Sequence, residues 1–129
     1  MSRELEGLRA GYDALWRHRD FDTAFGALPE DFESRSEFGL DFDSRGPEEF
    51  ARRFRDWFEL WDQLDSSYEL EDLGGGRVLV DVVTRGRGQA SGVEAEMKFT
   101  QVWRFEDGVA RDVVWYESRE QALADLRAQ

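Results

Sequence analysis

Apolar residues in the first half of the chain recur at the three- and four-residue spacing of a helix. In residues 3–19 this spacing predicts an amphipathic helix whose stripe contains Leu5, Leu8, Tyr12 and Leu15. Asp20 then predicts the N-cap of a short helix that ends at Pro29. The stretch 31–38 alternates instead, which predicts a strand.

The clearest helical pattern lies in residues 47–64. Pro47 stands at the start, where a helix does not use the missing N–H group, and an aromatic stripe follows. The members of the stripe are Phe50, Phe54, Trp57, Trp61 and Leu64. Because such a stripe is stable only when another layer covers it, we expect this helix to pack against a sheet.

The second half of the chain changes to the two-residue period of strands. Strands are predicted at 67–73, 77–87, 93–106 and 109–117, with Gly-rich or Asp-Gly turns between them. The segment 118–121 has the sequence of a capping box, which predicts a short C-terminal helix. Helices followed by successive hairpins are typical of an α+β fold, in which an antiparallel sheet carries helices on one face.

A curved sheet that closes over the aromatic helix leaves a cone-shaped cavity between the two layers. One face of the strand 93–105 carries Met97, Phe99, Gln101 and Trp103. We expect this face and the stripe in residues 50–64 to line the cavity. The amide of Gln101 then needs a hydrogen-bond partner, because an unpaired buried polar group costs about 1–3 kcal/mol.

Length, charge and composition narrow the class of protein. The 129 residues fit a single domain, 1–129. With 29 acidic and 17 basic residues the net charge is −12, which argues against nucleic acid or an anionic membrane as a partner. No apolar run is long enough to span a membrane and no signal peptide is recognisable, so a cytoplasmic location is expected. With no cysteine and one histidine, His18, we expect neither a metal site nor a cofactor.

Five segments, in this order, carry a resemblance to a known superfamily. They are LRAGYDALWRHRDFDTAF, LPEDFESR, RGPEEFARRFRDWFELWDQL, GRVLVDVVTRGRGQASG and MKFTQVWRFEDGVARDVVWYESREQALA. Along nearly its whole length the chain resembles the SnoaL-like branch of the nuclear transport factor two-like superfamily. The resemblance implies a cone-shaped, cystatin-like fold, homodimers across the open sheet face, and a deep pocket for small, mostly apolar molecules. Because the superfamily includes ketosteroid isomerases, polyketide cyclases and dehydratases, the fold does not define the reaction.

The resemblance points to Tyr12 and Gln101 as candidate catalytic residues. Ketosteroid isomerases hold a developing oxyanion with two donors and move a proton with one carboxylate. Tyr12 matches the oxyanion tyrosine, and Gln101 falls where these isomerases carry a protonated aspartic acid. The position of the general base matches Ser36, which cannot take a proton at neutral pH without a partner. Polyketide cyclases of the family place an acid near the end of the last strand, where Glu117 is the nearest carboxylate.

The other candidates are side chains expected to line the ligand pocket. They are Trp16, Ser36, Phe54, Trp57, Trp61, Phe99, Trp103, Val113 and Trp115. Two functions stay open. One is a cofactor-free acid–base enzyme, an isomerase, cyclase or dehydratase, acting on an apolar carbonyl compound. The other is a non-catalytic module that binds an apolar or polycyclic ligand, or a structural homodimer.

The open face of the sheet is the expected surface for a homodimer. Val80 or Val82, together with Val102, Val114 and Tyr116, would leave apolar atoms on a face that no helix covers. A second copy of the chain could cover them.

Overall fold

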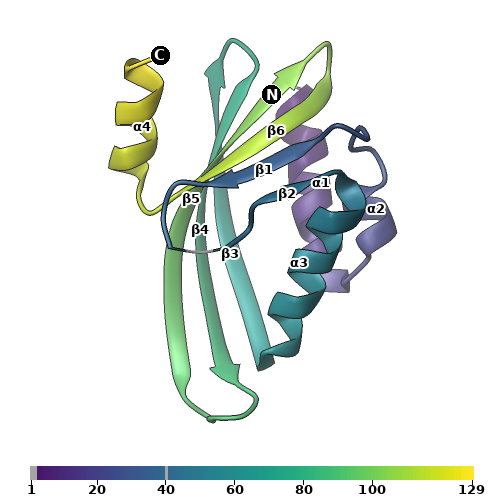
Figure 1. Cartoon of the computed structure of the whole chain (residues 1–129), viewed down its shortest axis with the longest axis vertical. Coiled ribbons are helices and arrows are strands. Elements are labelled where there is room, and N and C mark those ends of the chain that lie inside the picture. Colours follow the sequence, from purple (N-terminus) through teal and green to yellow (C-terminus); the bar gives the residue numbers. More distant parts are fainter. Residues whose placement is uncertain (1–2, 40) are drawn as a thin grey trace.

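The computed structural model describes residues 3–39 and 41–129. Figure 1 shows a strongly curved sheet with helices on both sides. On the concave side lie α1 (Arg3–His18), α2 (Phe21–Phe25) and α3 (Pro47–Glu59), and α4 (Arg119–Arg127) lies on the convex side. Asp20 caps α2 by accepting a hydrogen bond from the backbone N–H of Thr23, as predicted.

The sheet has the strand order β2-β1-β6-β5-β4-β3. Its strands are β1 (Glu33–Ser36), β2 (Ser44–Arg45), β3 (Trp61–Gly74), β4 (Arg77–Gly88), β5 (Glu94–Glu106) and β6 (Val109–Tyr116). The four longest strands form consecutive antiparallel hairpins, as predicted. Two of the turns, at 75–76 and 107–108, have a positive φ at both central residues, which is the geometry that Gly and Asp-Gly turns favour.

β1 runs parallel to β6, whereas the sequence predicts an antiparallel sheet. Ser34 lies opposite Val113 and Ser36 lies opposite Trp115. The strand is also shorter than the predicted 31–38, and the two-residue strand β2 was not predicted. The sheet is therefore mixed, while the predicted α+β class is confirmed.

Helix α3 ends at Glu59, before the predicted end at Leu64. Trp61 and Leu64 belong to β3, which pairs with β4 opposite Gly88 and Gly86. A Cβ atom on Gly86 would lie 2.7 Å from the Trp61 ring, so the glycine permits the strand to pack there. The apolar spacing continues past the boundary because α3 and the start of β3 face the same core.

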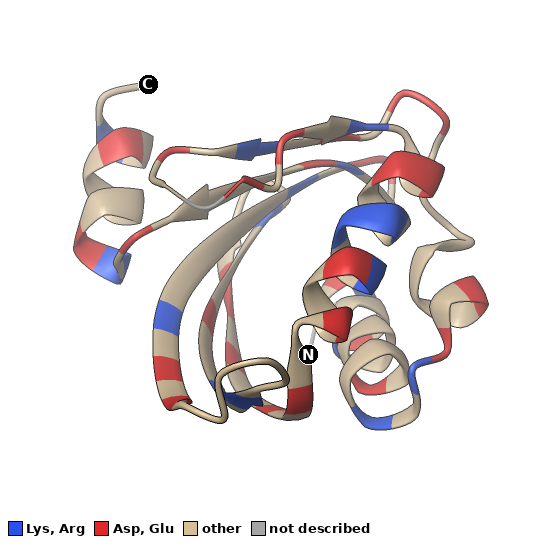
Figure 2. Ribbon diagram, turned by 60° about the horizontal axis from the view of Figure 1, so that its bottom comes forward, with Lys and Arg blue, Asp and Glu red and all other residues tan. Residues whose placement is uncertain are grey.

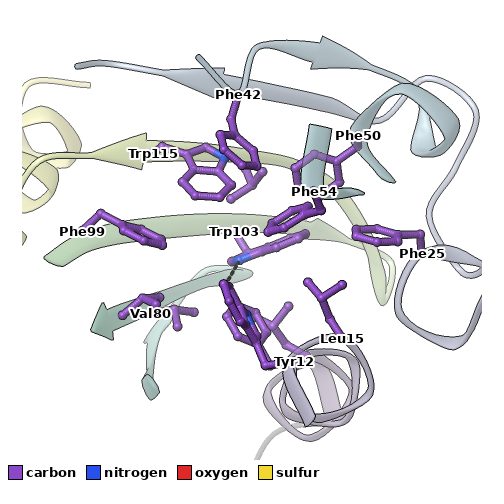
Figure 3. Close-up of a cluster of buried hydrophobic side chains, with 14 of the residues drawn as sticks. Tyr12, Leu15, Phe25, Phe42, Phe50, Phe54, Val80, Phe99, Trp103 and Trp115 are labelled. Atoms are coloured by element: carbon purple, nitrogen blue, oxygen red, sulfur yellow. Dashed lines mark hydrogen bonds between the residues drawn. The ribbon is translucent and has the colours of Figure 1, made fainter. Parts of the chain in front are cut away.

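The main core lies between α1–α3 and the concave face of the sheet, and most of its buried side chains are aromatic (Figure 3). A second, smaller cluster lies on the convex face, where Ala122 of α4 packs with Leu79, Val102 and Tyr116. Helix α4 thus covers the apolar part of the face that the sequence leaves open. Val80 and Val82 do not belong to that face, because both are buried in the concave core.

Candidate functional site

A cavity of about 460 Å³ lies between α1–α3 and the concave face of β4–β6. It brings together seven of the predicted site residues: Tyr12, Trp16, Phe54, Phe99, Gln101, Trp103 and Trp115. Figure 3 shows how α1 presents Tyr12 and Leu15 towards the rings on β5 and β6. The lining residues that are exposed, such as Arg3, Ala27 and Gly108, mark the mouth of the cavity.

Four candidate pocket residues lie outside the lining that the described residues form, and so do Leu64 and Met97 of the two faces that were expected to line it. The four candidates are Ser36, Trp57, Trp61 and Val113. Val113 is fully buried in the core, with no exposed surface. Trp57 and Trp61 are partly buried and contact each other, with ring centroids 5.5 Å apart. The Ser36 hydroxyl accepts a hydrogen bond from the backbone N–H of Phe42 at 3.4 Å. A pattern of apolar positions identifies core residues, but it does not tell which of them border an empty space.

The deep wall of the cavity contains a chain of three hydrogen-bonding side chains. The indole N–H of Trp103 donates to the hydroxyl oxygen of Tyr12 at 3.0 Å (Figure 3). The Tyr12 hydroxyl in turn donates to the side-chain carbonyl oxygen of Gln101. All three residues are buried. The amide that needed a partner therefore has one, but the partner is the tyrosine that the resemblance offers as a separate donor.

Burial raises the pKa of Tyr12 well above its ordinary value, and the hydrogen bond from Trp103 lowers it again only in part. The phenol is consequently neutral at physiological pH. Its single O–H is already engaged with Gln101. Tyr12 thus has no free donor to offer a ligand, although its ring lines the cavity.

Glu4 is the one carboxylate among the described residues that line the cavity. It lies on the same stripe of α1 as Leu8 and Tyr12, eight positions before the tyrosine. At a helical rise of about 1.5 Å per residue, this places it roughly 12 Å along the axis from Tyr12. Glu117, the other carboxylate that the sequence suggested, is exposed and does not line the cavity.

Several lining residues were not predicted from the sequence. They include Glu4, Leu8, Phe25 and Val82, whereas Phe50 lines the cavity as the stripe in residues 50–64 predicts. The signal for Leu8 was present, because it lies on the apolar stripe of its helix. Glu4 carried no signal, since an acidic residue in the first turn of a helix is ordinarily explained by the helix dipole.

Within residues 3–39 and 41–129, no group of three or more His, Cys, Asp or Glu side chains is arranged to hold a metal ion. In the same ranges, no helix is both long enough and apolar enough to cross a membrane.

Helices pack on the concave face of a curved sheet and leave a cavity between the two layers. Solved structures described as NTF2-like and as a cystatin fold share this arrangement, so the predicted nuclear transport factor two-like, cystatin-like fold is confirmed. The SnoaL-like domain family matches residues 8–118, and the chain belongs to this family. No curated protein matches the chain.

Solved structures share the fold over almost the full chain. An NTF2-like protein of unknown function from Burkholderia pseudomallei K96243 is 25% identical, with a TM-score of 0.77, and the match covers 96% of this chain and 97% of that one. TerC co-crystallised with polyporic acid is 20% identical, with a TM-score of 0.70, covering 99% and 100%. A Catenulispora acidiphila protein with a ketosteroid isomerase-like fold, in complex with trimethylamine, is 13% identical, with a TM-score of 0.71, covering 91% and 89%.

Proposed function

We propose that this protein binds a small, mainly apolar molecule in the cavity between α1–α3 and the sheet. The observation that carries the proposal is a space of about 460 Å³ whose deep wall is aromatic and contains one short polar chain. Small-molecule sites typically enclose about 300–1,000 Å³ and combine an apolar lining with a few polar groups. Proteins of the same fold that hold polyporic acid and trimethylamine support this class of function.

The shape of the wall favours a flat ligand. Phe99 and Trp115 stack with ring centroids 5.1 Å apart and an interplanar angle of 30°, and both rings line the cavity. The ring of Phe54 lies 5.9 Å from that of Trp115. Aromatic rings attract one another in offset or edge-to-face contacts, so these faces and edges suit a planar, unsaturated molecule.

The geometry favours binding over proton transfer. A general base has to lie within hydrogen-bond reach of the proton that it removes, about 2.6–3.2 Å between heavy atoms. A carbonyl group held at Gln101 would have its neighbouring C–H groups in the deep part of the cavity. Glu4, however, lies roughly 12 Å along the axis of α1 from Tyr12, the hydrogen-bond partner of Gln101. The hydroxyl of Ser36, at the position expected for the base, lies outside the cavity lining.

Calorimetric titration with indene, a flat bicyclic hydrocarbon, tests the proposal. The parent chain should bind indene at a single site. Ala110→Phe adds a ring to a residue that lines the cavity and should weaken binding about tenfold, equivalent to 1.4 kcal/mol. Ala124→Phe makes the same change at an exposed position on α4 and should leave binding unchanged. Absence of binding to the parent chain, or equal affinity in both variants, would overturn the proposal.

The same site can be tested for acid–base chemistry with 1-indanone in heavy water. A catalyst that removes and returns a proton next to the carbonyl would replace the C–H hydrogens at that carbon by deuterium, which NMR detects. We expect no exchange above that of buffer alone. Exchange that disappears in Glu4→Gln would establish a cofactor-free acid–base enzyme in place of a binding module.

We also propose that two copies of the chain form a homodimer through a charged strip on the convex face of the sheet. The strip has two cross-strand rows, Gln63–Arg87–Glu94 and Asp65–Arg85–Glu96. Basic positions of β4 lie beside acidic positions of β5 in both rows, and Figure 2 shows both kinds of residue on the long strands. A two-fold related copy can therefore set its basic positions against acidic ones. The apolar part of the face is already covered by α4, so electrostatic complementarity has to supply the specificity.

Sedimentation equilibrium of charge-reversal variants tests the pairing. The parent chain should sediment with twice the mass of one chain. Arg85→Glu places a like charge beside Glu96, with which Arg85 forms an ion pair at 2.7 Å, and should give the mass of one chain. Arg52→Glu changes the net charge equally at an exposed position on α3 and should leave the mass doubled. A single-chain mass for the parent would contradict the pairing.

A further inference from the structure

We infer that the cavity selects its ligand by hydrogen-bond polarity: the ligand presents an acceptor, such as a carbonyl oxygen, to the amide N–H group of Gln101, and Trp103 and Tyr12 are positioning residues that fix this polarity. The inference rests on the proposed function, because it needs a ligand in the cavity. It assigns to Tyr12 a role other than direct donation to the ligand.

The direction of the chain follows from the chemistry of its first member. An indole nitrogen can only donate a hydrogen bond. At 3.0 Å from the indole nitrogen of Trp103, the hydroxyl oxygen of Tyr12 therefore has to act as the acceptor. The hydroxyl has a single hydrogen, which is then directed at the one acceptor within its reach, the side-chain oxygen of Gln101.

The same chain determines which way the Gln101 amide is turned. If the amide were rotated by half a turn, its nitrogen would face the Tyr12 oxygen, which would then accept two hydrogen bonds. The hydrogen of the buried Tyr12 hydroxyl would have no acceptor, because nothing else in the described chain accepts from it. Burying an unpaired donor is costly. The observed orientation avoids that cost and turns the amide nitrogen away from Tyr12.

The amide nitrogen of Gln101 has no hydrogen-bond partner among the described residues. On the neighbouring strands Gln101 lies between Val80 and Trp115, neither of which has a side-chain acceptor. Gln101 lines the cavity, whereas Glu4, the lining carboxylate, lies towards the mouth. The deep part of the cavity thus offers the two N–H donors of the Gln101 amide, whereas its side-chain oxygen is already engaged with Tyr12.

Three flat molecules of similar size show whether the cavity prefers a ligand that accepts a hydrogen bond, one that donates a hydrogen bond, or one that does neither. Indene has no polar group, 1-indanone has an acceptor, and indole has a ring N–H donor. A carbonyl oxygen completes the hydrogen bonds of Gln101, so 1-indanone should bind about tenfold more tightly than indene. Indole would place its N–H group against the amide N–H group, so it should bind no better than indene.

Calorimetric titration of the parent chain and its variants tests the inference. In Gln101→Leu the preference for 1-indanone over indene should disappear. In Tyr12→Phe and Trp103→Phe the amide is released to turn its oxygen into the cavity, so the ratio of indole to 1-indanone affinity should rise several-fold. A purely structural role of Tyr12 would lower all three affinities without moving this ratio.

Tyr68→Phe is the matched control. The ring of Tyr68 contacts that of Tyr12, with centroids 5.1 Å apart, but its buried hydroxyl has no partner in the described chain and it does not line the cavity. This variant should keep the parent's ranking of the three probes. Should Gln101→Leu fail to fold, the ranking in the parent chain and in Gln101→Met gives the same information.

Each result has a defined meaning. Failure of all three molecules to bind the parent chain would overturn the proposed function and the inference with it. Binding of all three with equal affinity, or a preference for 1-indanone that persists in Gln101→Leu, would overturn the inference and leave the proposed function standing.

Discussion

The indole N–H of Trp115 donates a hydrogen bond to the hydroxyl of Ser34 at 2.9 Å, across 81 positions of the sequence. Trp115 is 1% exposed and Ser34 is 4% exposed, so water cannot replace either partner. The bond joins β1 to β6, the one parallel pair of the described sheet. It holds the ring of Trp115 at the wall of the cavity.

Removing the Ser34 hydroxyl should therefore destabilise the fold. In Ser34→Ala the buried indole N–H has no acceptor, and the free energy of unfolding in urea should fall by about 1–3 kcal/mol. Ser36→Ala is the control, because that hydroxyl has only a 3.4 Å hydrogen bond from a backbone N–H in a part-buried position. Equal losses in the two variants would contradict the importance of the Trp115 bond.

Gly86 should not tolerate a side chain. A Cβ atom there would lie 2.7 Å from the Trp61 ring and 2.9 Å from the backbone oxygen of Gln63. Overpacking of this kind costs about 1–3 kcal/mol, so Gly86→Ala should lower the midpoint of urea unfolding.

Gly7→Ala is the opposite case on the same measurement. Gly7 lies within α1, and a Cβ atom there would meet nothing within 4 Å. Because alanine favours a helix over glycine by about 1 kcal/mol, this variant should raise the midpoint. If the midpoint of urea unfolding of Gly86→Ala equalled that of the parent chain, the start of β3 would be able to shift and make room for the added side chain.

Stability should fall at alkaline pH because of two tyrosines. Burial raises the pKa of Tyr12, and burial together with the hydrogen bond to Asp125 raises the pKa of Tyr116. A group whose pKa is raised by folding contributes stability that is complete below its unfolded pKa, about 10 for tyrosine, and that is lost as the pH rises above it. The free energy of unfolding should therefore decrease above about pH 10.

Urea unfolding at several pH values distinguishes the contribution of Tyr12. Tyr12→Phe should be less stable than the parent chain at neutral pH, because the hydrogen bonds with Trp103 and Gln101 are lost. Its alkaline decrease should nevertheless be smaller, since one of the two titrating groups is absent. An unchanged slope of stability against pH would show that Tyr12 ionises in the folded chain as it does in the unfolded one.

Helix α4 should detach when a charge is placed at its buried side. Ala122 has no exposed surface and packs with Leu79, Val102 and Tyr116. Ala122→Asp buries a carboxylate among these side chains, so amide hydrogen exchange in residues 119–127 should become about tenfold faster, corresponding to 1.4 kcal/mol. Ala124→Asp carries the same charge on an exposed position of α4 and should exchange at the parent rate. Equal exchange rates in both variants would show that α4 does not depend on this contact.

Much of the candidate site could be predicted because strand alternation is a local property. Phe99, Gln101 and Trp103 share a face of β5 at every second position, and the cavity lies on that face. The amide of Gln101 had to find a partner, but its identity depends on how α1 crosses the sheet. Tyr12 is 89 positions away in sequence, and no local pattern relates the two residues.

The periodic elements, the hairpin turns and the aromatic character of the core could all be predicted from the sequence, because each follows from neighbours along the chain. Three features became visible only in the folded chain: β1 pairs in parallel with β6, α4 covers the apolar convex patch, and Trp61 belongs to β3 and not to the helix. The hydrogen bond between the Tyr12 hydroxyl and Gln101 is a fourth such feature. These features depend on contacts between segments far apart in sequence, whose energies are settled only when the layers pack together.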